Sequence, residues 1–236
     1  LIASGRPRRG SGSLPDAILK SYLSNGGQVR LESIVEKLQV ENKRVKAVQL
    51  QDGSVIEAPT VIAACDPHTV LVNWIDEAPV SAKSLISRWQ KEPAPEGYES
   101  KLDGIVQNLP TYKFMSELAG KFDHTDLSQS TVIISPSPEK LKEAHVLKGQ
   151  GLISDQPTML ASIPSALDPE MKADNGLHTF GLEVLFTPYS LSGGWQESKQ
   201  PDRWLKIWGN AMDGDFRSQI TKWRAMTCLL YTSPSP

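Results

Sequence analysis

Several features are scarce in this sequence of 236 residues, and each scarcity argues against a class of protein. Only two cysteines occur, so there is neither a disulphide framework nor the paired cysteine spacing of a zinc site. No apolar run approaches the roughly 18 residues needed to cross a bilayer. The formal net charge is -2 and no basic tract is interleaved with aromatics, which argues against nucleic-acid binding. We expect a protein without a transmembrane segment in a reducing compartment, either the cytoplasm or, in a eukaryote, the mitochondrial matrix.

The two ends of the sequence also lack expected features. The chain does not begin with methionine, and residues 1–10 have no apolar signal-peptide core, so we expect the natural N-terminus to lie upstream. Residues 228–236, CLLYTSPSP, continue no earlier pattern and look like a translated sequencing-adapter tail. The alternative is a natural disordered tail rich in Ser and Pro. Without these residues Cys65 is the only cysteine.

What is present has an ordinary globular composition, 39% hydrophobic and 22% charged. Residues 13–25 space their apolar side chains along one helix face, and Gly26-Gly27 predicts a left-handed helix end. Three later segments alternate polar and apolar residues between turn signals. They predict a three-stranded antiparallel meander of residues 37–41, 45–50 and 54–58.

Two segments flanking this meander predict strands of another kind. Residues 61–65, VIAAC, are an unbroken apolar run, which is typical of a strand covered on both faces in a parallel sheet. Residues 28–31, QVRL, supply a second short strand that we expect to lie parallel to it. Asp66-Pro67 then predicts the start of a helix that ends near Ile75. A meander that interrupts an α/β sheet is a recognised elaboration of dinucleotide-binding domains.

Several separated segments carry a family resemblance in the same order along the chain. Residues 10–67, GSGSLPDAILKSYLSNGGQVRL through VIAACDP, resemble the second part of the FAD-binding domain in phytoene-desaturase-like FAD-dependent oxidoreductases of the flavin amine oxidase superfamily. The branch that they resemble most is that of pyridine nucleotide-disulphide oxidoreductase domain-containing protein 2 and its bacterial relatives. Three further segments resemble the substrate side of that group: GYESKLDGIVQNLPTYK, SIPSALDPEMKADNGLH and LFTPYSLSGGW.

The resemblance implies a fold class and a domain organisation. The expected class is α/β of a mixed α+β kind, with part of a Rossmann-like FAD-binding domain in residues 1–76 and part of a mixed-sheet substrate domain in residues 77–227. No GxGxxG phosphate-binding fingerprint occurs in the chain. The closing glycine-rich segment of the family is missing too, so we expect an internal fragment of a flavoenzyme.

The resemblance also implies cofactor contacts. Val35 follows the first predicted strand, where relatives pair a valine backbone with the adenine edge of FAD. Ala63 and Ala64 end the predicted parallel strand and would let the backbone approach the nucleotide. Gly10 and Gly12 would face the flavin, although Arg9 stands where relatives usually carry a glycine. Core packing of Val35 and the alanines, and a flexible turn at the glycines, are the alternatives.

No catalytic residue is predicted, because flavin chemistry asks little of acid–base side chains. The four histidines have no metal-ligand spacing, and Ser165 lies outside any GxSxG motif. Residues 178–186, HTFGLEVLF, alternate as a strand, with Phe180, Leu182, Val184 and Phe186 inward and Glu183 outward. A substrate pocket could be walled by four aromatic residues, Phe180, Phe186, Tyr189 and Trp195. The alternative is that they form the core face of that strand.

The function expected from the resemblance is oxidation or dehydrogenation of an apolar or amine-bearing small molecule by hydride transfer to FAD. A flavin-free interaction protein similar to Rab GDP-dissociation inhibitors is the alternative, because these resemble the same fold. A carotenoid desaturase proper is less favoured, because the TPYSLSGGW segment resembles the other branch. The sequence leaves the oligomeric state unknown.

Overall fold

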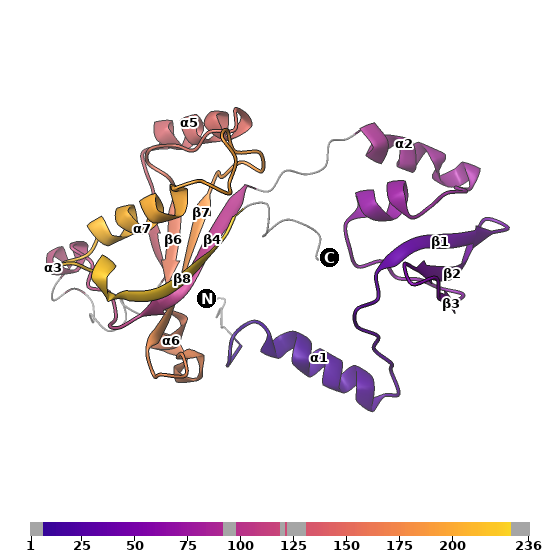
Figure 1. Ribbon diagram of the computed structural model, residues 1–236, viewed down its shortest axis with the longest axis horizontal. Coiled ribbons are helices and arrows are strands. Elements are labelled where there is room, and N and C mark those ends of the chain that lie inside the picture. Colours follow the sequence, from indigo (N-terminus) through magenta and orange to yellow (C-terminus); the bar gives the residue numbers. More distant parts are fainter. Residues whose placement is uncertain (1–6, 92–97, 119–120, 122–130, 228–236) are drawn as a thin grey trace. The chain divides into compact units, whose positions relative to one another are not determined.

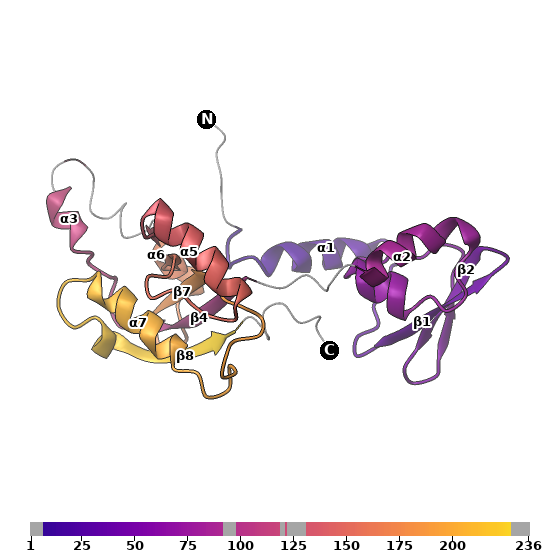
Figure 2. The same cartoon turned by 90° about the horizontal axis from the view of Figure 1, so that it is seen from above.

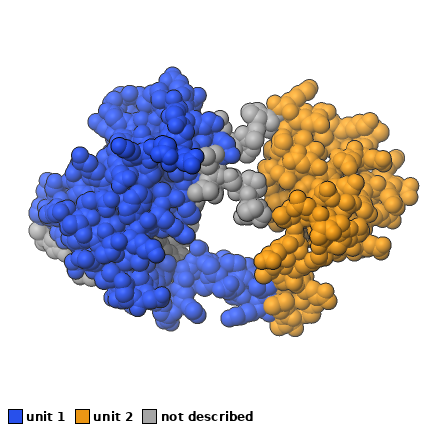
Figure 3. Space-filling model, in the orientation of Figure 1, with its two compact units in different colours: residues 1–21, 96–233 blue, residues 22–95, 234–236 orange. Residues whose placement is uncertain are grey.

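The computed structural model describes residues 7–91, 98–118, 121 and 131–227 (Figure 1). The chain divides into two compact units, one of residues 1–21 with 96–233 and one of residues 22–95 with 234–236 (Figure 3). We call them the sheet unit and the meander unit. Both units combine helices with antiparallel sheet, which confirms the mixed α/β class. The division into cofactor and substrate domains at residue 76 stays a prediction.

Helix α1 spans Ser13–Ser24, as its apolar spacing predicts. Gly26, just beyond the end of the helix, has a φ of 82°, the left-handed conformation expected there. None of its residues is buried, and Leu14 and Ile18 are 57% and 62% exposed. None of the described helices is long and apolar enough to cross a membrane.

The predicted antiparallel meander is confirmed. Strands β1 (Val35–Glu41), β2 (Arg44–Leu50) and β3 (Val55–Glu57) pair in the order β1-β2-β3. Asn42 and Lys43 both have positive φ, as a tight hairpin turn requires. The strands contribute a small core of Leu38, Ala47 and Leu50.

The helix predicted after Asp66-Pro67 forms, but its described element is a short π-helix, η1 (Thr69–Asn73). The Asp66 carboxylate accepts a hydrogen bond from the Thr69 backbone N–H at 2.8 Å, which confirms its capping role. The Leu38 N–H donates to the Trp74 carbonyl at 2.7 Å and so joins the end of η1 to β1. Two further helices follow in this unit, η2 (Val80–Ala82) and α2 (Lys83–Lys91).

The parallel pair of strands predicted on either side of the meander is wrong for this structure. Residues 28–31 and 61–65 have no strand pairing with any described residue. Leu31 is 80% exposed and Ile62 is 89% exposed. An unbroken apolar run favours burial on both faces, but burial also requires other helices or strands to cover those faces. An extended segment becomes a strand only beside a neighbour to which its backbone is hydrogen-bonded.

The sheet unit is built on five strands in the order β5-β6-β7-β4-β8 (Figure 1 and Figure 2). All four pairings are antiparallel, so the mixed sheet expected here is not seen among the described strands. The strand bounds are β4 Glu99–Val106, β5 Val132–Ile134, β6 Met159–Ser162, β7 His178–Leu185 and β8 Ile220–Met226.

Helix α7 (Gln200–Asn210) supplies Trp204, Leu205 and Trp208 to the core on one face of this sheet. Phe180 meets Trp208 at a ring-centroid distance of 5.0 Å. The other helices of the unit connect or flank the strands. They are α3 (Phe114–Glu117), α5 (Pro138–Gly149), α6 (Pro164–Leu167), η3 (Pro169–Met171) and η4 (Arg217–Gln219).

The register predicted for β7 is confirmed, except at its end. Phe180, Leu182 and Val184 are at most 2% exposed, whereas Glu183 is half-buried on the opposite face. Phe186 lies just beyond the strand with a φ of 58°. This left-handed conformation is rare for a bulky residue and takes Phe186 out of the alternation.

Candidate functional site

The segment before α1 forms a tight turn with two consecutive left-handed residues. Arg9 has a φ of 66° and Gly10 a φ of 86°. Within the turn the Gly10 N–H donates to the Pro7 carbonyl at 3.1 Å, and the Ser13 N–H donates to the Gly10 carbonyl at 3.2 Å. Arg9, which stands where relatives usually carry glycine, therefore has a backbone conformation that glycine adopts more easily.

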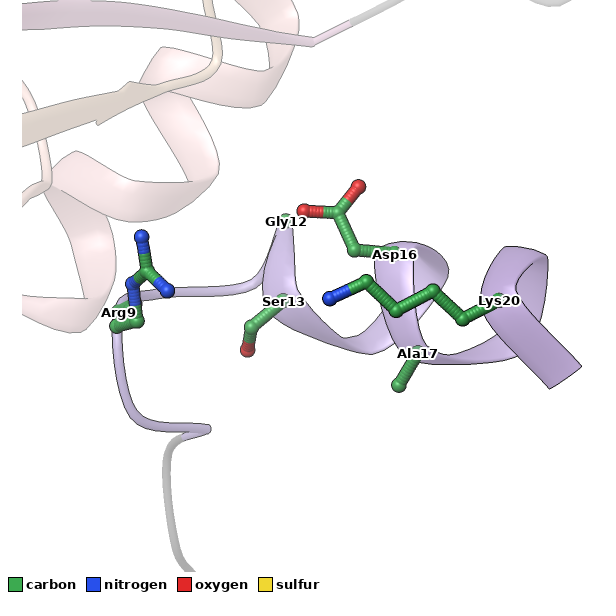
Figure 4. A pocket seen from close by; sticks show the side chains of 6 residues that line it. All are labelled: Arg9, Gly12, Ser13, Asp16, Ala17 and Lys20. Atoms are coloured by element: carbon green, nitrogen blue, oxygen red, sulfur yellow. The ribbon is translucent and has the colours of Figure 1, made fainter.

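A groove of about 300 Å³ follows this turn along the first half of α1 (Figure 4). The Lys20 side chain extends back toward the first turn of the helix (Figure 4). The groove combines two cations and one carboxylate with the positive end of a helix. Its lining residues are Arg9, Gly12, Ser13, Asp16, Ala17 and Lys20.

These groove residues fit one anionic group better than a whole dinucleotide. The lining carries two positive side chains and one negative one, so its net charge favours an anion. Gly12 leaves open space where the Cβ of another residue would stand. However, the N–H groups of Ser13 and Leu14 are already bonded to the carbonyls of Gly10 and Ser11. The groove can therefore hold part of a flavin cofactor, such as one phosphate, by charge rather than by a full set of free amides.

The other three predicted cofactor residues lie in the meander unit. Val35 opens β1, is half-buried and pairs with Leu50. Ala63 and Ala64 are exposed in the apolar run that forms no strand. Small exposed side chains leave the backbone approachable, but no feature of the described residues 22–91 identifies a ligand there.

The four predicted pocket aromatics divide between the core and the surface of the sheet unit. Phe180 is 2% exposed and Trp195 is 8% exposed, and both belong to the hydrophobic core. The Trp195 indole N–H is shared between the carbonyls of Pro188 and Tyr189 at 3.2 and 3.0 Å. Only Phe186 and Tyr189 keep enough accessible surface to meet a substrate, since Tyr189 is 37% exposed and Phe186 is half-buried.

Phe186 belongs to an aromatic cluster that the sequence did not predict. Its ring centroid lies 6.3 Å from that of Tyr98 and 6.2 Å from that of His145, which meets it edge-on. Tyr98 is 51% exposed and immediately precedes β4. The three residues are far apart in sequence, and only the pairing of β4 with β7 brings Tyr98 to Phe186. No local pattern could have shown this.

A pair of carboxylates lies near the same end of the sheet. Glu99 pairs with Leu185, and Lys101 pairs with Glu183. Partial burial raises the pKa of Glu99, and the nearby Glu183 charge raises it further, whereas Lys101 acts in the opposite direction.

Ser165 and His178 are joined, but not as a hydrolase pair. Ser165 is 2% exposed, and its hydroxyl accepts from the Thr179 N–H at 2.9 Å. The same hydroxyl lies 3.1 Å from the His178 Nδ1. Burial lowers the pKa of His178 and nearby Lys172 lowers it further. The buried hydroxyl thus fixes the start of β7.

Comparison with curated proteins finds relatives among oxidoreductases. The chain is 29% identical over 199 residues to pyridine nucleotide-disulfide oxidoreductase domain-containing protein 2 of Rattus norvegicus, and 28% identical to that of Mus musculus. Both alignments cover 81% of this chain and 33% of the relative. It is also 23% identical over 165 residues to phytoene desaturase (lycopene-forming) of Pseudescherichia vulneris, covering 70% of this chain and 30% of that protein. The chain thus spans about a third of the length of these relatives.

Among solved structures, an oxidoreductase from Methanosarcina mazei shares the fold with a TM-score of 0.57 at 13% identity. The match covers 94% of this chain and 43% of that one. Residues 3–178 match the family described as flavin containing amine oxidoreductase, and this span includes the turn, the groove, the meander and strands β4, β5 and β6 of the five-stranded sheet. The chain therefore belongs to the flavin containing amine oxidoreductase family.

Proposed function

We propose that the protein is an FAD-dependent oxidoreductase that dehydrogenates or oxidises an apolar or amine-bearing small molecule. The observation that carries the proposal is the family match over residues 3–178. Membership supports a flavin and a redox reaction, and the resemblance of residues 10–67 to an FAD-binding domain makes FAD the specific choice. The flavin, when bound, supplies the acceptor for the substrate hydride.

In this proposal the chain's own residues bind the cofactor and enclose the substrate. Gly10 and Gly12 bring the turn before α1 close to the flavin, and Arg9 and Lys20 supply positive charge to the groove beside it. Val35, Ala63 and Ala64 offer backbone to the nucleotide. No side chain is assigned a proton-transfer step.

The proposed substrate class rests on the aromatic surface of the sheet unit. The rings of Tyr98, Phe186 and His145 cluster there, and Tyr189 is partly exposed in the loop that follows β7. A cluster of aromatic rings suits an apolar substrate, and ring faces also attract an ammonium group.

Anaerobic reduction of the flavin tests this function. The complete polypeptide that contains these residues is loaded with FAD and mixed without oxygen with amines and with apolar alkenes and polyenes. We expect one of these panels to bleach the oxidised flavin, and Tyr98→Ala to raise the substrate concentration needed. Val146→Ala is the matched control, because Val146 is 57% exposed on α5 beside His145. Bleaching by neither panel would contradict the proposed substrate class.

A further inference from the structure

A carboxylate from far along the chain holds the turn before α1. The Asp168 Oδ2 atom accepts a hydrogen bond from the Arg9 backbone N–H at 2.6 Å, across 159 residues of sequence. The Asp168 Oδ1 atom accepts from the Glu170 N–H at 3.0 Å and caps η3. One half-buried carboxylate therefore binds two backbone segments at once.

Packing at Gly10 reinforces this contact. Gly10 packs closely against Met171, because a side-chain Cβ at position 10 would lie only 3.1 Å from the terminal methyl carbon of Met171. The Met171 carbonyl accepts from the Thr179 hydroxyl at 2.9 Å, and Thr179 belongs to β7. The turn is thus tied through η3 to the strand that forms the middle of the five-stranded sheet.

The ion pairs around this contact are weaker than the Asp168 hydrogen bond. Glu170 lies 2.8 Å from the Arg8 guanidinium and 3.7 Å from that of Arg9, but both arginine side chains are more than 70% exposed. Solvent screens such pairs strongly. The hydrogen bond from the Arg9 N–H to the Asp168 carboxylate is also exposed, but it is short and holds the backbone of the turn itself, so it restrains the turn more.

The left-handed backbone explains why the turn needs a restraint. A non-glycine residue with positive φ is disfavoured by contacts of its Cβ, so Arg9 would relax toward other conformations if nothing held it. Such strained residues persist only where the surroundings over-determine them, and they cluster at functional sites.

We infer that Asp168 is a positioning residue, which holds the Arg9–Gly10 turn in the geometry that the flavin site needs. The inference rests on the proposed function, because the proposal is what places Gly10 and Gly12 at the flavin. Through Asp168, the turn proposed to face the cofactor is linked to the sheet proposed to face the substrate.

Trypsin tests the contact without any flavin, because it cleaves after Arg8 and Arg9. In Asp168→Ala we expect cleavage after Arg9 to be about tenfold faster, which corresponds to about 1.4 kcal/mol. Asp174→Ala is the matched control. Asp174 is an exposed carboxylate in the same connection, without a hydrogen bond or ion pair to any described residue, and this variant should match the unsubstituted chain. Glu170→Gln should change cleavage less than Asp168→Ala.

The affinity for FAD of the complete polypeptide then tests the positioning role. We expect the Kd for FAD to rise about tenfold in Asp168→Ala and to stay unchanged in Asp174→Ala, with equal urea midpoints confirming that both variants fold. Faster cleavage with unchanged Kd would overturn the inference, because the contact would then be structural alone. Unchanged cleavage would also overturn it. A complete polypeptide that binds no FAD before any substitution would instead refute the proposed function.

Discussion

Phe180 lies in the closely packed core of the sheet unit. It is 2% exposed, contacts Trp208, and its ring also fills the space that a side chain at position 104 would need. Phe180→Ala should therefore lower the free energy of unfolding by about 3–5 kcal/mol. Glu183→Gln, on the opposite face of β7, should change it by no more than about 0.5 kcal/mol. Urea midpoints of the two variants measure this, and a larger loss in Glu183→Gln would mean that the register of β7 is off by one residue.

His178 should make stability depend on pH. Its pKa is lowered in the folded chain, so folding favours the neutral ring, which can accept a hydrogen bond from Ser165. This contribution is fully present above the unfolded pKa of about 6.5 and is lost as the pH falls toward the folded pKa. We expect the urea midpoint to fall between pH 7.5 and 5.5 by more in the unsubstituted chain than in His178→Asn. Equal falls in the two proteins would refute a role for His178.

The backbone of the turn between β1 and β2 is strained at Lys43. Lys43 has a φ of 66° in the turn, and glycine adopts that conformation without the Cβ contacts that lysine suffers. Lys43→Gly should raise the free energy of unfolding by up to about 1 kcal/mol, which would appear as a higher urea midpoint of the meander unit. Lys46→Gly is the control, because Lys46 is exposed within β2, where glycine weakens a strand. A lower midpoint in Lys43→Gly would show that the turn is not under strain.

Elements whose partners are close in sequence were predictable. The spacing in α1, the turn between residues 50 and 54 of the meander and the alternation in β7 each specify a structure through local contacts, and the structure contains all three. Residues 61–65 failed because an apolar run does not reveal what covers it. The Tyr98 and Phe186 cluster and the Asp168 contact were missed because strand pairing and a contact across 159 residues create them.

We expect the chain by itself to supply only part of a dinucleotide site. It contains no GxGxxG segment, and the groove at α1 is lined by two cations and one carboxylate. Phosphate held from one side of a cleft lacks the additional helix-terminus amides that stabilise its charge. These 236 residues, purified alone and passed through gel filtration with FAD, should therefore emerge colourless. Yellow protein at that stage would show that the glycine-rich segment is dispensable.

If these residues belong to a flavoenzyme, the complete polypeptide must bind a flavin, and one visible spectrum shows whether it does. The complete polypeptide that contains them is expressed, incubated with FAD, separated from free flavin by gel filtration and scanned in the visible range. We expect the two absorption bands of oxidised flavin, at close to one flavin for each chain. A folded, colourless polypeptide would contradict it and would favour a flavin-free binding protein of the same fold.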